Sequence, residues 1–322
     1  MTKIELTGIT WITTYNCNIS CDHCFFYTQG EKKYMDPELI DIALKDFKYG
    51  NKMFWQHFSG GEIFLNTDKL IKIIQNLIKY FDKDIGLVTN GFWAKSIEES
   101  MLMIDKLKGI GVTSLSVSSD HFHQSLLDKE NPGNLISALA KEKMNSFILS
   151  GVLGKDIPGS KNLKSENDKL FNDLSINKIP SIAEVEIRSI GKGSKLNIPK
   201  KKFIPQGKCT ELSTCLGESE SFNPKMIWID PYGNVMICYG ITIGNLYKNT
   251  LNEIIESFDP KNNRLFSILA ENGPKGLYKY ARSKGIDLPD EYYDECDLCY
   301  QVRSKLRMIH SEVLSPMECY PV

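Results

Sequence analysis

The chain has 322 residues, of which 42% are hydrophobic and 25% charged, and its formal net charge is −1. This composition is typical of a globular protein with a sizeable core, and the near-neutral charge disfavours a nucleic acid partner. The first residues lack the basic and apolar regions of a secretory signal, and no apolar stretch is long enough to span a membrane. We therefore expect a cytoplasmic protein that acts away from membranes.

Over the first 190 residues or so, short apolar runs alternate with helical patterns, as expected for strands joined by crossover helices. The pattern predicts strands over residues 8–13, 53–58, 85–89, 112–118, 146–153 and 182–187. It predicts helices over residues 37–49, 68–81, 96–110, 134–143 and 167–174. Because polar motifs follow several of these strands, we predict an α/β fold, a partial (β/α)6 TIM-like barrel with its active site at the carboxyl ends of the strands. A flat doubly wound sheet is the alternative that periodicity leaves open.

After residue 191 the chain changes character. Residues 191–217 are rich in Lys, Pro and Gly and are predicted to form a loop. Residues 226–230 and 234–238 flank Pro231-Tyr232-Gly233, which is typical of a hairpin turn. Helices are expected over residues 250–257, near 276–283 and over 299–313. We therefore expect a barrel over residues 1–192 and a small α+β extension over residues 193–322.

The cysteines are the most informative feature of the composition. They are Cys17, Cys21 and Cys24, then Cys209, Cys215 and Cys238, then Cys296 and Cys299, with Cys319 alone. Reducing compartments disfavour structural disulfides, so clustered cysteines there indicate metal or redox chemistry. The first three follow the first predicted strand and could ligate three irons of a cubic cluster, which leaves the fourth iron open to an exogenous ligand. A zinc site is the alternative.

Polar motifs follow the next predicted strands. Ser59-Gly60-Gly61-Glu62 comes after the second strand, where two glycines let the backbone approach a ligand closely and Glu62 can accept hydrogen bonds. Thr89-Asn90-Gly91 closes the third strand, and Ser116-Val117-Ser118-Ser119-Asp120 closes the fourth. The alternative for Asn90, Ser118 and Asp120 is a role as helix caps and turn residues. His121 and His123 are expected at the rim of the site, either as proton-transfer groups or in ordinary packing.

In this order the motifs resemble the radical SAM superfamily, whose signature is C-x3-C-x2-C after the first strand. The resemblance implies a [4Fe–4S] cluster with one open iron on Cys17, Cys21 and Cys24, and S-adenosyl-L-methionine (SAM) bound to that iron. In the family, electron transfer from the cluster cleaves SAM to methionine and a 5′-deoxyadenosyl radical. His23 stands where relatives commonly have an aromatic residue. The implied cofactor-binding residues are Gly60, Gly61, Glu62, Asn90, Ser118, Asp120, Arg188 and His23.

The later cysteines resemble the extension called SPASM, or its shorter twitch form, which carries auxiliary iron–sulfur clusters. The resemblance implies one auxiliary [4Fe–4S] cluster on Cys215, Cys238, Cys296 and Cys299. Cys209 is the alternative to Cys215, and a zinc site with four cysteines is the alternative to the cluster. The remaining cysteines are expected to be inert thiols or hydrogen-atom donors.

Cys21-Asp22-His23-Cys24, the Gly-Gly-Glu motif and Thr89-Asn90-Gly91-Phe92-Trp93 most resemble enzymes that modify ribosomally made peptides, including peptide epimerases. Those epimerases carry an adjacent cysteine pair late in the chain, whereas Tyr239 follows Cys238 here. We expect abstraction of a hydrogen atom from a peptide, leading to epimerisation, crosslinking or oxidation. Radical chemistry on a small molecule is the alternative, and a non-catalytic zinc or iron–sulfur protein is a third possibility.

The expected partners follow from this chemistry. They are a peptide substrate and an electron donor such as a flavodoxin or ferredoxin. The first predicted strand begins within the first dozen residues, so we expect no fused module for peptide recognition ahead of it. A leader sequence would then be bound by the barrel, the extension or a separate recognition protein.

Overall fold

The computed structural model describes residues 6–27, 33–50, 53–173, 181–202 and 225–320. Six parallel strands form the first half of its main sheet and pair in chain order. They are β1 (Gly8–Ile12), β2 (Trp55–Ser59), β3 (Asp84–Thr89), β4 (Ser114–Ser118), β5 (Phe147–Val152) and β6 (Ser181–Glu186). Among the described residues the sheet is open, with β6 at one edge, so the predicted α/β fold with a partial barrel is confirmed.

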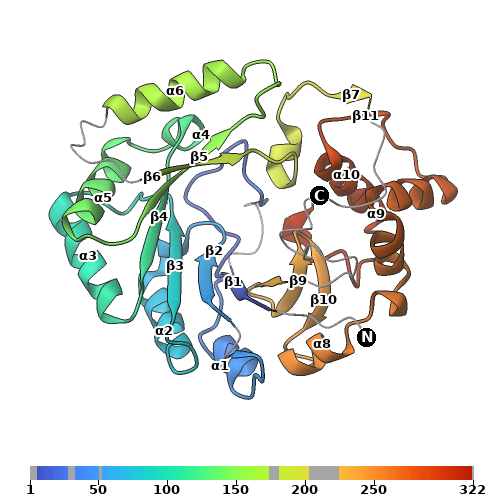
Figure 1. Ribbon diagram of the computed structural model, residues 1–322, viewed down its shortest axis with the longest axis horizontal. Helices are drawn as coiled ribbons and strands as arrows, with labels where there is room; N and C mark the ends of the chain where they lie inside the picture. The colour runs from blue at the N-terminus through green and yellow to red at the C-terminus, as the bar shows by residue number, and fades with distance from the viewer. Residues whose placement is uncertain (1–5, 28–32, 51–52, 174–180, 203–224, 321–322) are drawn as a thin grey trace.

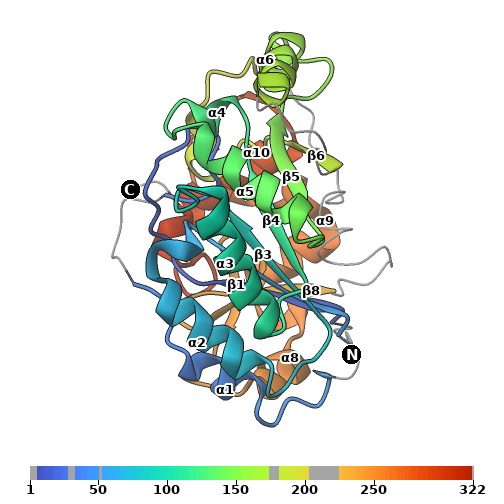
Figure 2. The same ribbon diagram turned by 90° about the vertical axis from the view of Figure 1, so that its left-hand side faces the viewer.

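The helices of this half lie on the outer face of the curved sheet (Figures 1 and 2). They are α1 (Glu38–Leu44), α2 (Thr67–Leu77), α3 (Ile97–Gly109), α5 (Glu130–Lys141) and α6 (Ser160–Asp173). The short helix α4 (His121–Gln124) follows the carboxyl end of β4, and its His123 lines the cavity described below. The helix α2 buries an apolar stripe that includes Leu70, Ile74 and Leu77. Asn66 caps its start by accepting a hydrogen bond from the Lys69 amide.

The helix α1 ends earlier than the predicted residue 49, and a contact with the second half explains why. The side chain of Asn252 accepts a hydrogen bond from the Lys48 amide at 3.1 Å and donates one to the Asp46 carbonyl at 2.7 Å. These backbone groups would have to pair within a longer helix, so the contact replaces helical hydrogen bonds.

The second half extends the same sheet. Its elements are β7 (Lys201–Lys202), β8 (Met226–Ile229), β9 (Asn234–Cys238), β10 (Ile241–Asn245), α8 (Leu251–Ser257), α9 (Arg264–Ser283), β11 (Glu291–Tyr292) and α10 (Glu295–Leu306). Short 3-10 turns occupy η2 (Ile63–Asn66), η3 (Gly191–Lys195), η4 (Pro260–Asn262) and η5 (Met317–Cys319). The strand β8 pairs with β1 in parallel, from Gly8 opposite Met226 to Trp11 opposite Ile229. The hairpin of the expected extension is therefore continuous with the barrel sheet.

Three elements of this half differ from the prediction. The strand β10 was not predicted, and it follows a turn in which Gly240 has a φ of +68°. The helix α9 begins well before residue 276 because Asn263 caps an earlier segment, which joins the predicted one across a kink at Gly273. The helix α10 begins at Glu295, where Asp294 accepts a hydrogen bond from the Asp297 amide at 2.7 Å.

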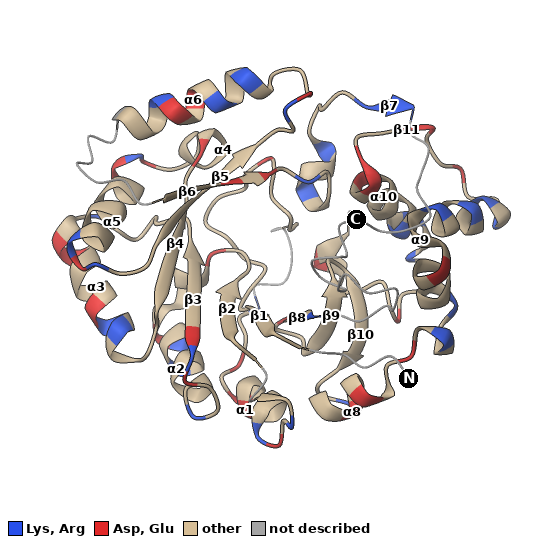
Figure 3. Cartoon of the chain, viewed as in Figure 1, with Lys and Arg blue, Asp and Glu red and all other residues tan. Residues whose placement is uncertain are grey.

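Charged side chains of both signs are interspersed on the outer helices, such as α3 and α6, and are sparse on the strands (Figure 3). The strand β1 lies inside the sheet and contributes Ile9, Trp11 and Ile12 to the core. Trp11 donates a hydrogen bond to the side chain of Gln56 on the neighbouring strand at 2.7 Å. No helix of the described segments is long and apolar enough to cross a membrane.

Candidate active site

A cavity of about 210 Å³ lies where the six parallel strands end. Its walls include Cys17, Cys21, Cys24, His23, Gly60, Gly61, Glu62, Asn90, Ser118 and Asp120. Residues that are far apart in the sequence therefore meet at the carboxyl edge of the sheet, as the barrel prediction requires. The described cavity lining does not include Arg188, which lies 3.9 Å from the Asp294 carboxylate.

The cysteine loop, residues 16–24, begins against the two glycines that follow β2. The Gly61 amide donates a hydrogen bond to the Thr14 carbonyl at 2.7 Å, and the Glu62 amide donates one to the Asn16 carbonyl at 2.8 Å. A Cβ atom on Gly61 would lie 2.0 Å from the Asn16 oxygen. Gly60 has a φ of +136°, in the region that favours glycine. Both glycines are therefore needed to hold the start of the loop.

The rest of the cysteine loop is held from two sides. Asn90 lies just after the end of β3. Its side-chain amide nitrogen donates a hydrogen bond to the Asn18 side chain at 2.9 Å and lies 3.7 Å from the Cys17 sulfur. On the other side, the Gly193 amide donates to the Cys24 carbonyl at 3.0 Å. Asn90 therefore positions the loop as well as lining the cavity.

The three thiols of the loop are buried or half-buried, and none forms a disulfide. Burial raises the pKa of Cys17 to about 12, and it also raises the pKa of Cys21 and of Cys24. Negative charge on Cys24 or Cys17 would raise the pKa of Cys21 further. All three residues line the same cavity. Thiols in such a group lose their protons when they bind a metal, and thiolates are the ligands of iron–sulfur clusters. The donor set fits the predicted cluster.

The carboxyl group of Glu62 is buried in the cavity wall and held by three donors. The Phe64 amide and the Thr89 hydroxyl donate to Oε1 at 3.0 and 2.8 Å, and the Asn90 amide donates to Oε2 at 2.8 Å. Burial raises the pKa of Glu62 to about 7, although these hydrogen bonds favour the charged form. Thr89 was not among the predicted site residues, although it belongs to the Thr-Asn-Gly motif that supplied Asn90.

We expect Glu62 to make the cluster-free protein less stable as the pH rises from about 5 to about 8. Its pKa is about 7 in the folded chain against an ordinary 4.5, so folding favours the protonated form. The free energy of unfolding is therefore highest below pH 4.5 and falls as the pH rises through 7, by about 3 kcal/mol from this group. Urea unfolding at both pH values measures the change.

Glu62→Gln should show a smaller loss of stability between the two pH values than the wild type. Glu271→Gln, which removes an exposed carboxylate from α9, is the matched control and should keep the dependence of the wild type. An unchanged dependence in Glu62→Gln would contradict the assignment.

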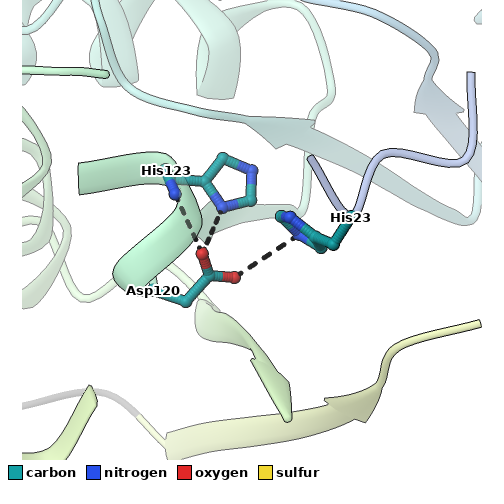
Figure 4. Close-up of side chains that lie close together, drawn as sticks. All are labelled: His23, Asp120 and His123. Carbon is teal, nitrogen blue, oxygen red and sulfur yellow. Dashed lines mark hydrogen bonds and ion pairs between the residues drawn. The ribbon is translucent and has the colours of Figure 1, made fainter. Parts of the chain in front are cut away.

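Asp120 lies between two histidines at the end of β4 (Figure 4). Its Oδ1 accepts hydrogen bonds from the His123 amide at 3.0 Å and, at 2.8 Å, pairs with Nδ1 of the same residue. Its Oδ2 accepts a hydrogen bond from the Gly151 amide at 2.9 Å and lies 3.6 Å from Nε2 of His23. Burial alone would raise the pKa of Asp120. The hydrogen bond from His123, together with the positive charge that His123 and His23 carry when protonated, lowers this pKa to about 2. Asp120 is thus a helix cap and a cavity residue at once.

The two neighbouring imidazoles differ from His121. Burial lowers the pKa of His23 to about 4, so its ring is neutral at neutral pH, and its Nδ1 has no hydrogen-bond partner within the described part of the chain. His123 lines the cavity, although the sequence did not distinguish it from His121. His121 is half exposed and lies 3.1 Å from Glu166.

The second group of predicted ligands is described only in part. Cys238 ends β9, and Cys296 and Cys299 lie one turn apart on α10. Cys215, and its alternative Cys209, lie outside the described residues.

Comparison with known proteins was made by sequence and by fold. Residues 11–141 match the family model described as the Radical SAM superfamily. Over 160 residues the chain is 29% identical to YydG from Bacillus subtilis (strain 168), whose name associates it with peptide biosynthesis. This match covers 45% of the chain and 50% of YydG, so it spans about half the length of that relative.

Solved structures share the fold at low sequence identity. Streptococcus suis SuiB bound to its precursor peptide SuiA has a TM-score of 0.57 and 11% identity, with 92% of this chain and 76% of SuiB covered. The protein anSMEcpe with bound AdoMet has a TM-score of 0.53 and 13% identity, with 96% of this chain and 97% of anSMEcpe covered. These likenesses show the fold alone.

Proposed function

Because residues 11–141 match the model of the Radical SAM superfamily, we propose that this chain binds a [4Fe–4S] cluster and SAM and abstracts a hydrogen atom from a peptide. The observation that carries the proposal is the meeting of three thiols with Glu62 and Asn90 in the walls of one cavity. When bound, a reduced cluster with an open iron supplies the electron that cleaves SAM to methionine and the 5′-deoxyadenosyl radical.

Different residues of the cavity wall are proposed to bind different groups of SAM. A carboxylate has about four acceptor positions, and the contacts of Glu62 occupy three of them, which leaves one on Oε2 for the ammonium group of SAM. The unpaired Nδ1 of His23 can bind a polar atom of SAM, because a buried polar atom is costly without a partner. Ser118 and Asp120 line the same wall and remain proposed contacts. Arg188 has an acidic neighbour outside the wall, so it is the weakest member of the predicted set.

A peptide is the substrate class that the comparisons favour. The name of YydG associates that protein with peptide biosynthesis, and SuiB was solved with a precursor peptide. The sheet ends at β6 among the described strands, and Val185 and Glu186 of this strand line the cavity wall. Epimerisation, crosslinking and oxidation are all outcomes of such a hydrogen abstraction.

We further propose that Cys238, Cys296 and Cys299, with Cys215, hold one auxiliary [4Fe–4S] cluster. The thiols of the cysteine loop form no disulfide, which suits a reducing compartment, so we place the protein in the cytoplasm. A flavodoxin or ferredoxin would then reduce the enzyme, and a separate recognition protein would bind a leader sequence.

The test combines the reconstituted, reduced enzyme with SAM and short peptides encoded beside its gene, under anaerobic conditions. We expect 5′-deoxyadenosine by chromatography and a defined mass change in one peptide by mass spectrometry. Formation of 5′-deoxyadenosine with a mass change only in a small molecule would overturn the peptide assignment. Absence of 5′-deoxyadenosine from protein that carries its cluster would overturn the proposed chemistry as a whole.

A further inference from the structure

Arg303 on α10 is a positively charged side chain in the core of the second half, and only 2% of its surface is exposed. One terminal nitrogen, Nη1, donates hydrogen bonds to the Tyr239 carbonyl at 2.6 Å and to the Tyr320 hydroxyl at 2.9 Å. The guanidinium also lies over the rings of Tyr300 and Tyr320, 5.7 and 5.9 Å from their centroids. These contacts hold the group in one place.

All of these partners are neutral. Within the described segments, no carboxylate pairs with Arg303, and its buried Nε has no hydrogen-bond partner. A buried charge without a counter-charge costs several kcal/mol, so a guanidinium in this position requires a negative group nearby.

Two cysteines predicted as ligands, Cys299 and Cys238, are among the nearby groups that can carry negative charge, together with Cys319. Cys299 lies one turn before Arg303 on the same face of α10. Cys238 directly precedes Tyr239, whose carbonyl holds Nη1. Burial opposes the charge of Arg303, whereas Tyr320, Cys299 and Cys238 raise its pKa well above the ordinary value. Thiolates bound to a metal would supply the missing counter-charge.

We propose that Arg303 is the counter-cation of the auxiliary iron–sulfur site and raises its reduction potential. A fixed positive charge stabilises the reduced cluster, which carries one more electron, more than the oxidised cluster. Net charge around a cluster is a recognised way in which proteins set its potential. This inference rests on the proposed auxiliary cluster and adds a positioning residue to it.

The experiment uses the full chain with Cys17, Cys21 and Cys24 replaced by alanine, so that the auxiliary site is the one expected to assemble a cluster. Protein reconstituted with iron and sulfide is titrated with a reductant and followed by electron paramagnetic resonance. In Arg303→Met we expect the equilibrium constant for one-electron reduction to fall at least tenfold, which is about 59 mV. Arg303→Gln, which can still donate to the Tyr239 carbonyl, should shift in the same direction if the methionine variant does not fold.

Two variants separate charge from structure. Tyr320→Phe removes a hydroxyl that pairs with Arg303 but keeps the charge, so its shift should be less than tenfold. Arg303→Lys keeps the charge and should retain most of the potential. The proposal would also be supported if the wild type and Arg303→Lys bind iron at the auxiliary site whereas Arg303→Met and Arg303→Gln do not. Three results would overturn the proposal. The reduction potential could be the same in the wild type and all variants, the site could bind zinc in place of iron, or Arg303→Lys could lose its iron as the other variants do.

The proposed function is measured separately, as 5′-deoxyadenosine formed by the chain with its native cysteine loop. SAM cleavage with an unresponsive auxiliary potential would therefore reject the role of Arg303 and leave the proposed function intact.

Discussion

Replacement of Cys17, Cys21 and Cys24 by alanine is expected to lower 5′-deoxyadenosine formation at least ~1000-fold, to the background of the assay. The three sulfurs line one cavity, and the described cavity lining offers no other thiol that could replace them. Without them, the electron that cleaves SAM has no donor beside the bound nucleotide. Iron analysis and chromatography of the anaerobic reaction measure both losses.

Cys319→Ala is the matched control for this experiment. Cys319 is fully buried, lies outside the described cavity lining and is therefore not expected to hold the SAM-binding cluster. Its replacement should leave 5′-deoxyadenosine formation near the wild-type rate. Undiminished formation in the triple variant would refute the assignment of the cysteine loop.

Gly61→Ala is expected to destabilise the chain by about 3 kcal/mol and to prevent the cluster from assembling at full occupancy. The new methyl carbon would overlap the Asn16 carbonyl, whose oxygen lies 2.0 Å from the position of a Cβ. The backbone on one side must therefore move, and on the other side Asn16 leads directly into Cys17. Thermal unfolding of the cluster-free protein and its iron content after reconstitution measure the two effects.

Gly109→Ala provides the comparison, since nothing lies within 4 Å of a Cβ at that position on α3. Alanine favours the helix more than glycine does, so this variant should be more stable by about 0.5–1 kcal/mol and should bind iron normally. Equal stability of the two alanine variants would show that the close approach of Gly61 is not needed.

Much of the fold was accessible from the sequence because strands and helices of the first half have strong local periodicity. All six parallel strands were predicted within a few residues, and so were the motifs that follow them. The barrel rule then placed Cys17, Glu62 and Asn90 at one edge of the sheet, where the structure has them. The positions of the motifs after the strands predicted which residues meet in the cavity, because parallel strands end at the same edge of the sheet.

What the sequence did not predict depends on contacts between distant segments. The pairing of β8 with β1 and the strand β10 have no local signal beyond short apolar runs. The ends of α1 and α9 are determined by Asn252 and Asn263, which were not recognised as partners. Arg303 was overlooked because one buried arginine looks like any other in a sequence. Its spacing of four residues from Cys299 was the available signal.

The parallel pairing of β1 with β8 has a consequence for how the protein is made. The amide of Thr7 bonds to the Lys225 carbonyl at 2.7 Å, and the side-chain contact between the same residues spans 218 positions. Contacts this distant form late and slowly, because a long loop must close first. During synthesis, the strand that precedes the cysteines therefore lacks one neighbour until the hairpin has left the ribosome. We therefore expect the cysteine loop to bind iron fully only after the hairpin over residues 226–238 has paired with β1.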